Sequence, residues 1–302
     1  MTDLDRDLRL ALFAHIGRLR ELDGGIVTAA RLNEGMIFRG ARVPIWNQQK
    51  GIFKPALLGK DGAALTIQTS FESPYDDGAD RESGRITYRY RGTDPDHLDN
   101  RALRQAHRLR RPLLYLVGVQ PGVYSATFPF YVVGDRPEDL AFELMADMPG
   151  DLDRSFDRPL LENEALKEYA TRTVRQRLHQ QRFRYLVLKA YREQCAMCRL
   201  RHTSLLDAAH ILPDRDDRGK PEVPNGLALC KIHHSAYDVG IVGVDPAYRI
   251  HLRHDILDEV DGPMLRHGLQ ELHGTALSVP KRGEQKPNKD FLAERFERFL
   301  AA

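Results

Sequence analysis

The three cysteines of this 302-residue chain all lie within one short segment, and their spacing constrains the fold of that segment more than any other feature. Cys195 and Cys198 form a Cys-x2-Cys pair, and Cys230 and His233 form a Cys-x2-His pair downstream. Paired thiolate and imidazole ligands at such spacing are typical of a tetrahedral structural zinc site. We therefore predict that zinc joins the two pairs and holds this segment together.

Two other histidines, His202 and His234, compete with His233 for the fourth zinc position. The alternative is that the cysteines are inert and buried. An odd cysteine count in a metal-type pattern argues against a disulfide framework. No apolar run approaches the ~20 residues that span a bilayer, and the acidic N-terminus lacks an apolar signal core. These features predict a cytoplasmic protein with no membrane partner.

The pattern of apolar, polar and turn residues changes along the chain and predicts an α+β fold. Apolar residues recur at helical spacing in the first part, and short β-prone runs alternate with turn residues in the second. A helical, Arg- and Gln-rich stretch follows the Pro149-Gly150 turn. The predicted parts are an N-terminal helix (1–25), a β-rich domain with a curled sheet or barrel (26–150), a helical linker (151–185) and the metal-binding domain with a C-terminal extension (186–302).

Positive charge is concentrated ahead of and within the metal segment. Between Arg172 and Lys220 there are twelve Lys and Arg residues and five acidic residues, although the net charge of the whole chain is only +2. A basic stretch of this kind suits a polyanionic partner. The alternative is a solvated helix face that binds nothing.

Several residues between the two cysteine pairs have no role in binding zinc. They are Asp207-Ala-Ala-His210-Ile, Asn225-Gly and His234. Phosphodiester hydrolysis needs a general base for the attacking water, and a divalent cation that stabilises negative charge at phosphorus and on the leaving oxygen. His210, on a predicted strand, and His234, at the start of a predicted helix, suit these two tasks if the fold brings them together.

The same residues resemble the HNH (ββα-metal) nucleases, in the branch with an Ala-Ala-His-Ile element. The matching elements are Asp207-Ala-Ala-His210-Ile, Asn225-Gly-Leu-Ala-Leu-Cys230 and His233-His234-Ser-Ala-Tyr-Asp238-Val-Gly240. The resemblance covers about residues 183–244. It implies a one-metal deoxyribonuclease in which His210 is the general base, Asn225 orients that base or its loop, and His234 binds the catalytic metal.

Two aspartates are candidates for the second protein ligand of the catalytic metal. Many HNH enzymes carry Asp or His directly before the base, where this chain has Ala209. Asp207 shares the strand face of position 209 but lies about 6–7 Å further along. Asp238 is the other candidate ligand. The metal is Mg²⁺, Mn²⁺ or another divalent cation, because a His/Asp site completed by water suits several.

The β-rich part resembles the SRA domain, a PUA-like reader that flips a modified cytosine out of duplex DNA. The resemblance rests on Tyr75-Asp-Asp-Gly-Ala-Asp80, Gly84-Arg-Ile-Thr-Tyr88 and Asn100-Arg-Ala-Leu103. A flipped base needs aromatic faces and polar groups that read its edge. The resemblance implies Tyr75 and Tyr88 as stacking residues and Asp77 or Asp80 as acceptor of the exocyclic amine. Alternatively, the tyrosines are half-buried strand residues.

Together these resemblances predict a modification-dependent restriction endonuclease that binds double-stranded DNA. One HNH centre cuts one strand, so a double-strand break implies a homodimer or repeated nicking. Two alternatives remain. The β-rich domain senses a nucleotide signal, a protein or unmodified DNA, or the zinc-stapled element only binds DNA and has no activity.

Overall fold

The computed structural model describes residues 3–22, 25–70, 86–146 and 164–301. It divides the chain into two compact units, unit 1 (Met1–Leu178) and unit 2 (His179–Ala302), each with its own buried core. The division falls inside helix α4 (Glu164–Ala190). No helix in the described part is long and apolar enough to cross a membrane.

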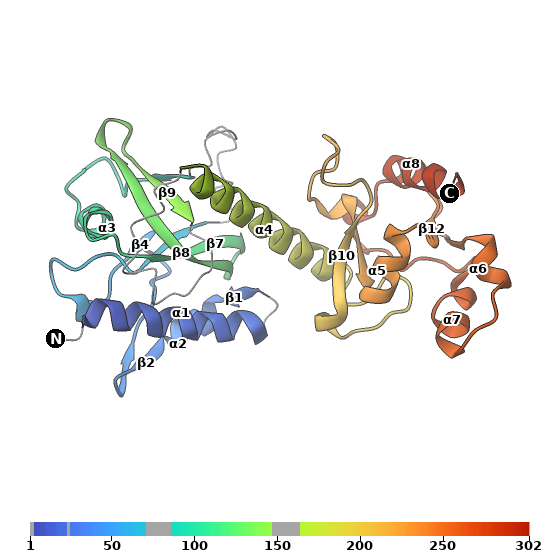
Figure 1. Ribbon diagram of the computed structural model, residues 1–302, viewed down its shortest axis with the longest axis horizontal. Helices are drawn as coiled ribbons and strands as arrows, with labels where there is room; N and C mark the ends of the chain where they lie inside the picture. Colours follow the sequence, from blue (N-terminus) through green and yellow to red (C-terminus); the bar gives the residue numbers. More distant parts are fainter. Residues whose placement is uncertain (1–2, 23–24, 71–85, 147–163, 302) are drawn as a thin grey trace. The chain divides into compact units, whose positions relative to one another are not determined.

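Unit 1 is built on a curled, mixed sheet, which has seven strands within the described residues (Figure 1). Six strands follow the order β4-β5-β7-β8-β9-β6, and β1 pairs with β8. All neighbours are antiparallel except β5 and β7. The strands are β1 (Ile26–Thr28), β4 (Ile52–Phe53), β5 (Thr66–Thr69), β6 (Ile86–Arg89), β7 (Leu113–Gln120), β8 (Val123–Arg136) and β9 (Ala141–Ala146).

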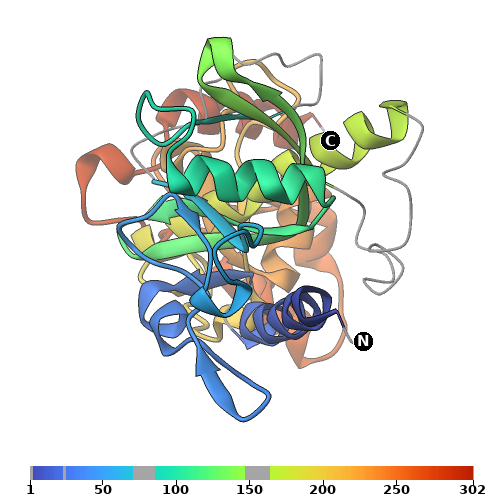
Figure 2. The same cartoon turned by 90° about the vertical axis from the view of Figure 1, so that its left-hand side faces the viewer.

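Helices cover both faces of this sheet, which is why the central strand β7 is apolar along its length. Alternate residues of β7 enter two different cores. Tyr115 packs with helix α3, whereas Leu114 and Leu116 pack with helix α1. Figure 2 shows α1 and α3 on opposite sides of the strands. The helices and the remaining hairpin are α1 (Leu4–Leu22), α2 (Ala29–Glu34), α3 (Leu98–Arg108), β2 (Met36–Phe38) and β3 (Ala41–Val43).

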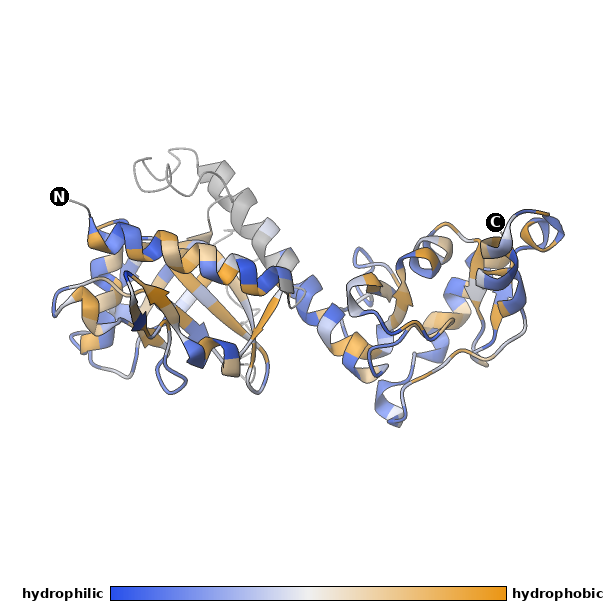
Figure 3. Ribbon diagram, turned by 90° about the horizontal axis from the view of Figure 1, so that it is seen from below, coloured by the Kyte–Doolittle hydropathy of each residue, from blue (hydrophilic) through white to orange (hydrophobic). Residues whose placement is uncertain are grey.

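Helix α1 is held to the sheet by a buried cation as well as by its apolar stripe, which Figure 3 shows alternating with polar residues. Arg9 is fully buried and donates to the carbonyl oxygens of Pro112 at 2.6 Å and Ala64 at 2.9 Å, while Asp5 accepts from its Nε at 2.9 Å. Burial lowers the pKa of Arg9 to about 10. Each of the three guanidinium nitrogens has a partner, so α1 has a fixed register on the sheet.

Unit 2 places a β-hairpin and a short helix around a single apolar core. The hairpin strands are antiparallel, and they pair Leu206 with Cys230 at one end and His210 with Gly226 at the other. The core also takes residues from α4 and from the C-terminal helices. The elements after α4 are β10 (Leu206–His210), β11 (Gly226–Cys230), α5 (Lys231–Asp238), β12 (Val242–Val244), β13 (Ile250–Leu252), α6 (His254–Asp258), α7 (Pro263–Gly268) and α8 (Lys289–Leu300).

The mixed helix and strand content and the curled sheet expected from the sequence are confirmed. Helix α3 begins at Leu98, where the His97 side chain caps it by accepting from the backbone N–H of Asp99 at 3.2 Å. The SRA/PUA-like relationship of unit 1 and the bounds of the four predicted parts remain predictions.

Candidate active site and metal centre

The three cysteines and His233 form one compact cluster at the base of the hairpin. Their ligand atoms all lie within 4.8 Å of one another. The Sγ atoms of Cys198 and Cys230 are 4.0 Å apart, close to the roughly 3.8 Å between two thiolates on tetrahedral zinc. His233 Nδ1 lies 3.4 Å from the Sγ of Cys195 and 3.1 Å from that of Cys230. This donor set can hold zinc without rearrangement.

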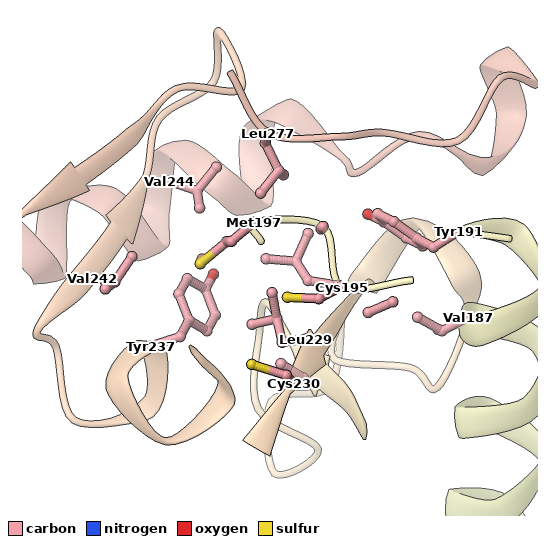
Figure 4. Packing of buried hydrophobic residues seen from close by; sticks show 14 of the residues in the cluster. Val187, Tyr191, Cys195, Met197, Leu229, Cys230, Tyr237, Val242, Val244 and Leu277 are labelled. Carbon is pink, nitrogen blue, oxygen red and sulfur yellow. The ribbon is translucent and has the colours of Figure 1, made fainter. Parts of the chain in front are cut away.

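A backbone carbonyl fixes the ring of His233 for this task. Its Nε2 donates to the oxygen of Gly268 at 2.7 Å, and its Nδ1 faces the thiols as the ligand atom. Of the two competing histidines, His202 is exposed and lies outside the cluster, and His234 contacts Asp207 instead. Figure 4 shows Cys195 and Cys230 among the apolar side chains of the unit 2 core. The cluster therefore joins the hairpin to that core.

The hairpin and helix α5 bring the predicted catalytic histidines to one region. His210 is the last residue of β10, paired with Gly226 at the start of β11. His234 lies in α5, which begins directly after Cys230 and packs on both strands. His210 and His234 interact electrostatically. The chain thus forms a β-hairpin followed by a helix, with the cysteine cluster at the junction of strand and helix.

His210 has a ring nitrogen that is free to accept a proton. Its ring stacks on Phe183 of α4, with centroids 4.1 Å apart and planes inclined by 23°. Its Nε2 is buried and has no hydrogen-bond partner in the described part of the chain. Burial lowers the pKa of His210, although Asp214 opposes the shift. The imidazole is therefore neutral near pH 7, as a general base must be.

His234 lies between the two aspartates that compete for the role of metal ligand. Its Nδ1 is 3.9 Å from Asp207 Oδ2, and its Nε2 is 3.3 Å from Asp238 Oδ2. The carboxylate of Asp207 raises the pKa of His234, and His234 in turn lowers the pKa of Asp207. Both aspartates are within reach of the histidine. The contacts therefore leave either carboxylate able to share a cation with it.

Asn225 uses its side chain to hold the loop that follows His210. The amide is buried, and its Oδ1 accepts from the N–H of Leu212 at 2.8 Å. Its Nδ2 donates to the carbonyl oxygens of Leu212 and Lys220, each at 3.1 Å. These bonds close the loop between the two strands. Of the two roles implied for Asn225, the contacts favour orientation of the loop over direct contact with the base.

Arg184 is a site residue whose role the sequence reasoning did not identify. It was one of many basic residues expected to contact phosphate. Its Nη2 donates to the carbonyl oxygens of Thr203 at 2.7 Å and Leu206 at 2.8 Å, and its Nε lies 3.4 Å from Asp207 Oδ1. The guanidinium thus holds the start of β10 and one candidate metal ligand. Nothing in the local sequence distinguishes it from the other arginines of α4.

The predicted base-reading residues of unit 1 are described only in part. Tyr75, Asp77 and Asp80 lie outside the described residues. Tyr88 lies on β6 and is 6% exposed, and its hydroxyl donates to the carbonyl oxygens of Gly51 at 2.7 Å and Gln68 at 3.1 Å. Burial raises its pKa. Tyr88 is therefore packed as a core residue, and its role in stacking on a base remains a prediction.

Comparison with known proteins identifies the segment that carries this geometry. The family model described as HNH endonuclease matches residues 195–245. This segment is an HNH endonuclease domain. The match includes all four residues of the cysteine cluster, both histidines predicted to be catalytic, and Asn225. The match does not reach Phe183 and Arg184. These two residues belong to α4, and they contact the matched segment from outside it.

Two solved structures resemble the chain at low identity. A "Modification dependent TagI restriction endonuclease" is 15% identical with a TM-score of 0.30, and the alignment covers 83% of this chain and 86% of that one. The "Type IV phosphorothioation-dependent restriction endonuclease ScoMcrA" is 14% identical with a TM-score of 0.21, and the alignment covers 80% and 52%. No curated protein matches the chain.

The HNH domain presents the groups that hydrolysis of a phosphodiester requires. One neutral imidazole has a free nitrogen, and a second imidazole lies between carboxylates that can help it to hold a divalent cation. Water and phosphate oxygens can complete the coordination of such a cation, which suits Mg²⁺ or Mn²⁺. The fold thus separates the cysteine cluster from a second group of residues, His210, His234, Asp207 and Asp238, whose chemistry suits hydrolysis.

Proposed function

We propose that this chain is a DNA endonuclease that hydrolyses phosphodiester bonds with a one-metal HNH centre. The observation that carries the proposal is the unpartnered Nε2 of His210, next to a His234 that contacts Asp207 and Asp238. A purely structural zinc module has no need of a buried, neutral histidine with a free nitrogen. This arrangement argues against the alternative in which the element only binds DNA.

In the proposed reaction, His210 Nε2 takes a proton from the water that attacks phosphorus. The new P–O bond forms as the bond from phosphorus to the 3′-oxygen breaks. The cation, when bound, stabilises the negative charge that develops on the phosphoryl and leaving oxygens. Phe183 keeps the imidazole in place by stacking, and Asn225 holds the loop behind it. Arg184 holds Asp207, one of the two carboxylates that would bind the cation together with His234.

We further propose that unit 1 recognises modified cytosine by base flipping and that the protein restricts modified foreign DNA. The support is the sequence resemblance that includes Tyr75, Asp77, Asp80 and Tyr88. On this proposal the protein acts on duplex DNA, and a double-strand break requires a homodimer or two successive nicks. Zn²⁺ is the proposed structural ion, and Mg²⁺ or Mn²⁺ the proposed catalytic one.

One observation favours a second candidate, an HNH nuclease whose unit 1 senses something else. The ring of Tyr88 lies edge-on to that of Tyr115, with ring centroids 6.2 Å apart. Its hydroxyl already donates to two backbone carbonyl oxygens. Stacking on a base would require the ring to leave this core. A nucleotide signal, a protein or unmodified DNA would place no such demand on Tyr88.

Cleavage of matched plasmids distinguishes these proposals. The purified protein is incubated with Mg²⁺ or Mn²⁺ and with plasmids that carry cytosine, 5-methylcytosine, 5-hydroxymethylcytosine or N6-methyladenine. We expect cutting of one cytosine-modified plasmid and none of the unmodified plasmid. His210→Ala should cut none of the four, which separates the activity of this chain from a contaminating nuclease.

Equal cutting of all four plasmids would keep the nuclease and remove the modified-cytosine reader. Wild-type activity in the His210→Ala variant would remove the proposed catalytic centre. The absence of cutting by the wild type would favour a different trigger or a protein that only binds DNA.

A further inference from the structure

A basic groove lies along the outer face of helix α3, in unit 1. The cavity has a volume of about 350 Å³, and four cationic side chains line it. They are Lys60, Arg101, Arg104 and Arg108. Asp61 and Asp96 also reach its wall. The HNH site, in unit 2, uses none of these residues, and the sequence analysis did not single them out.

One of the four cations is fixed in place. Arg104 Nε donates to Asp135 Oδ2 at 2.6 Å, and its Nη2 donates to the Tyr90 hydroxyl at 3.1 Å. Its side chain is only 17% exposed, and the oxygen of Pro95 accepts from Nη1 at 3.3 Å. The Arg104–Asp135 pair is therefore part of the scaffold of the groove. Its charge is largely balanced by that carboxylate.

The other three cations are exposed and have no partner among the described residues. Lys60, Arg101 and Arg108 form no ion pair or side-chain hydrogen bond with any residue that the structure describes. Arg91, by contrast, is paired with Asp99. These three cations share the concave surface with two carboxylates, Asp61 and Asp96, so the groove keeps an excess of positive charge. Such a surface attracts a polyanion.

The spacing of the arginines suits an extended anion. Arg101 and Arg108 are seven residues apart, so they lie on one face of α3 and about 10.5 Å apart along its axis. This span is longer than one phosphate group and matches a run of successive phosphates. The opposite face of α3 is buried through Leu103 and Ala106 against the sheet, which keeps the row of cations rigid.

We propose that the α3 groove binds the phosphodiester backbone of duplex DNA, through Lys60, Arg101 and Arg108. This inference rests on the proposed function, because it assumes that the polyanion is DNA. The contacts would position unit 1 on the duplex and carry no sequence information. Free nucleotides carry the same phosphate chemistry, so the experiment includes them.

The test measures DNA binding by the full chain over a range of salt concentrations. All proteins carry His210→Ala, so that the substrate is not cut. Log K falls as log [salt] rises, and we call the steepness of that fall the slope; each phosphate contact that is removed lowers this slope by about 1. Arg101→Ala/Arg108→Ala should therefore lower the slope by about 2 and weaken binding to modified and unmodified duplexes equally. The control Arg18→Ala/Arg31→Ala removes the same charge from two exposed positions outside the groove.

A second variant, Arg101→Lys/Arg108→Lys, restores charge and should restore the slope, which excludes misfolding as the cause of a loss. A slope unchanged in the alanine variant, or lowered equally in the control, would overturn the proposal. The proposal would also be overturned if the wild-type groove bound ATP more tightly than duplex DNA and the alanine variant lost that ATP binding. If the wild type neither binds nor cuts DNA, the proposed function itself has failed. If it cuts while the groove variant keeps the slope, only this inference has failed.

Discussion

At the scale of single residues, the site depends on how one histidine is buried. His210 is stacked on Phe183 and has one nitrogen without a partner. Burial disfavours the imidazolium ion and so lowers the pKa of His210 below its ordinary value of 6.5. The ring thus stays neutral in the pH range where an unburied histidine would begin to be protonated. The same contact keeps the ring from turning away from the substrate.

The pH profile of cleavage should show this effect. Cutting needs neutral His210. The cleavage rate should therefore rise as the pH is raised from acid, reach half of its maximum below pH 6.5, and stay level at higher pH. Phe183→Leu admits water to the ring and reduces the penalty on the charged form, so the midpoint should move toward 6.5. Phe291→Leu, a partly buried position packed on the same core, is the control. A midpoint above 6.5 in the wild type would contradict the burial argument.

The second metal ligand is also a question about single residues. Asp207 is less exposed than Asp238, at 38% against 54%, and Arg184 holds it. We therefore expect Asp207→Asn to raise the Mg²⁺ concentration for half-maximal cutting by about tenfold or more, as loss of a ligand or of its support does. Asp238→Asn should raise it by much less. Titration of cleavage with Mg²⁺ measures both, and the reverse order would assign the role to Asp238.

At the scale of elements, the cysteine cluster joins the hairpin, helix α5 and the turn before them. Cys198 is exposed, unlike Cys195 and Cys230, so truncating it leaves no cavity in the core. Any large loss of stability on Cys198→Ala therefore reports lost metal, whose binding contributes about 10 kcal/mol or more in small zinc domains. We expect that variant to lose zinc and unit 2 to unfold, measured by metal content and thermal unfolding.

Met197→Leu is the matched control in the same turn, because a volume-conserving change in a core costs less than about 1.5 kcal/mol. It should keep both zinc and fold. A Cys198→Ala protein that is stable without metal would contradict the structural role of zinc.

Two buried asparagines fix loops in the same way, one in each unit. Asn225 bonds Leu212 and Lys220, and Asn100 accepts from Arg91 N–H at 2.8 Å and donates to the oxygen of Asp94 at 2.8 Å. In both cases a side-chain amide pairs with backbone groups that no strand or helix satisfies. The sequence motifs contained both residues, but only the fold shows that their partners are loop backbone groups.

At the scale of the whole molecule, the sequence indicated a β-rich part and a metal-binding part, and the structure has two compact units. Short-range patterns account for this. Alternating apolar and polar residues indicate the strands, and apolar residues at helical spacing indicate α1. The Cys-x2-Cys and Cys-x2-His pairs indicate the metal cluster. Each of these signals needs only residues that are close in the chain.

By itself, the sequence indicated a cluster of the three cysteines with a histidine, the order of the HNH elements and the mixed fold, because ligand spacing and periodicity are local properties. Only the tertiary structure decided that Phe183 stacks on His210, that Arg184 holds Asp207 and that Tyr88 is a core residue. It also placed three unpaired cations along one groove. These are contacts between residues far apart in the chain, and their geometry depends on how the elements pack.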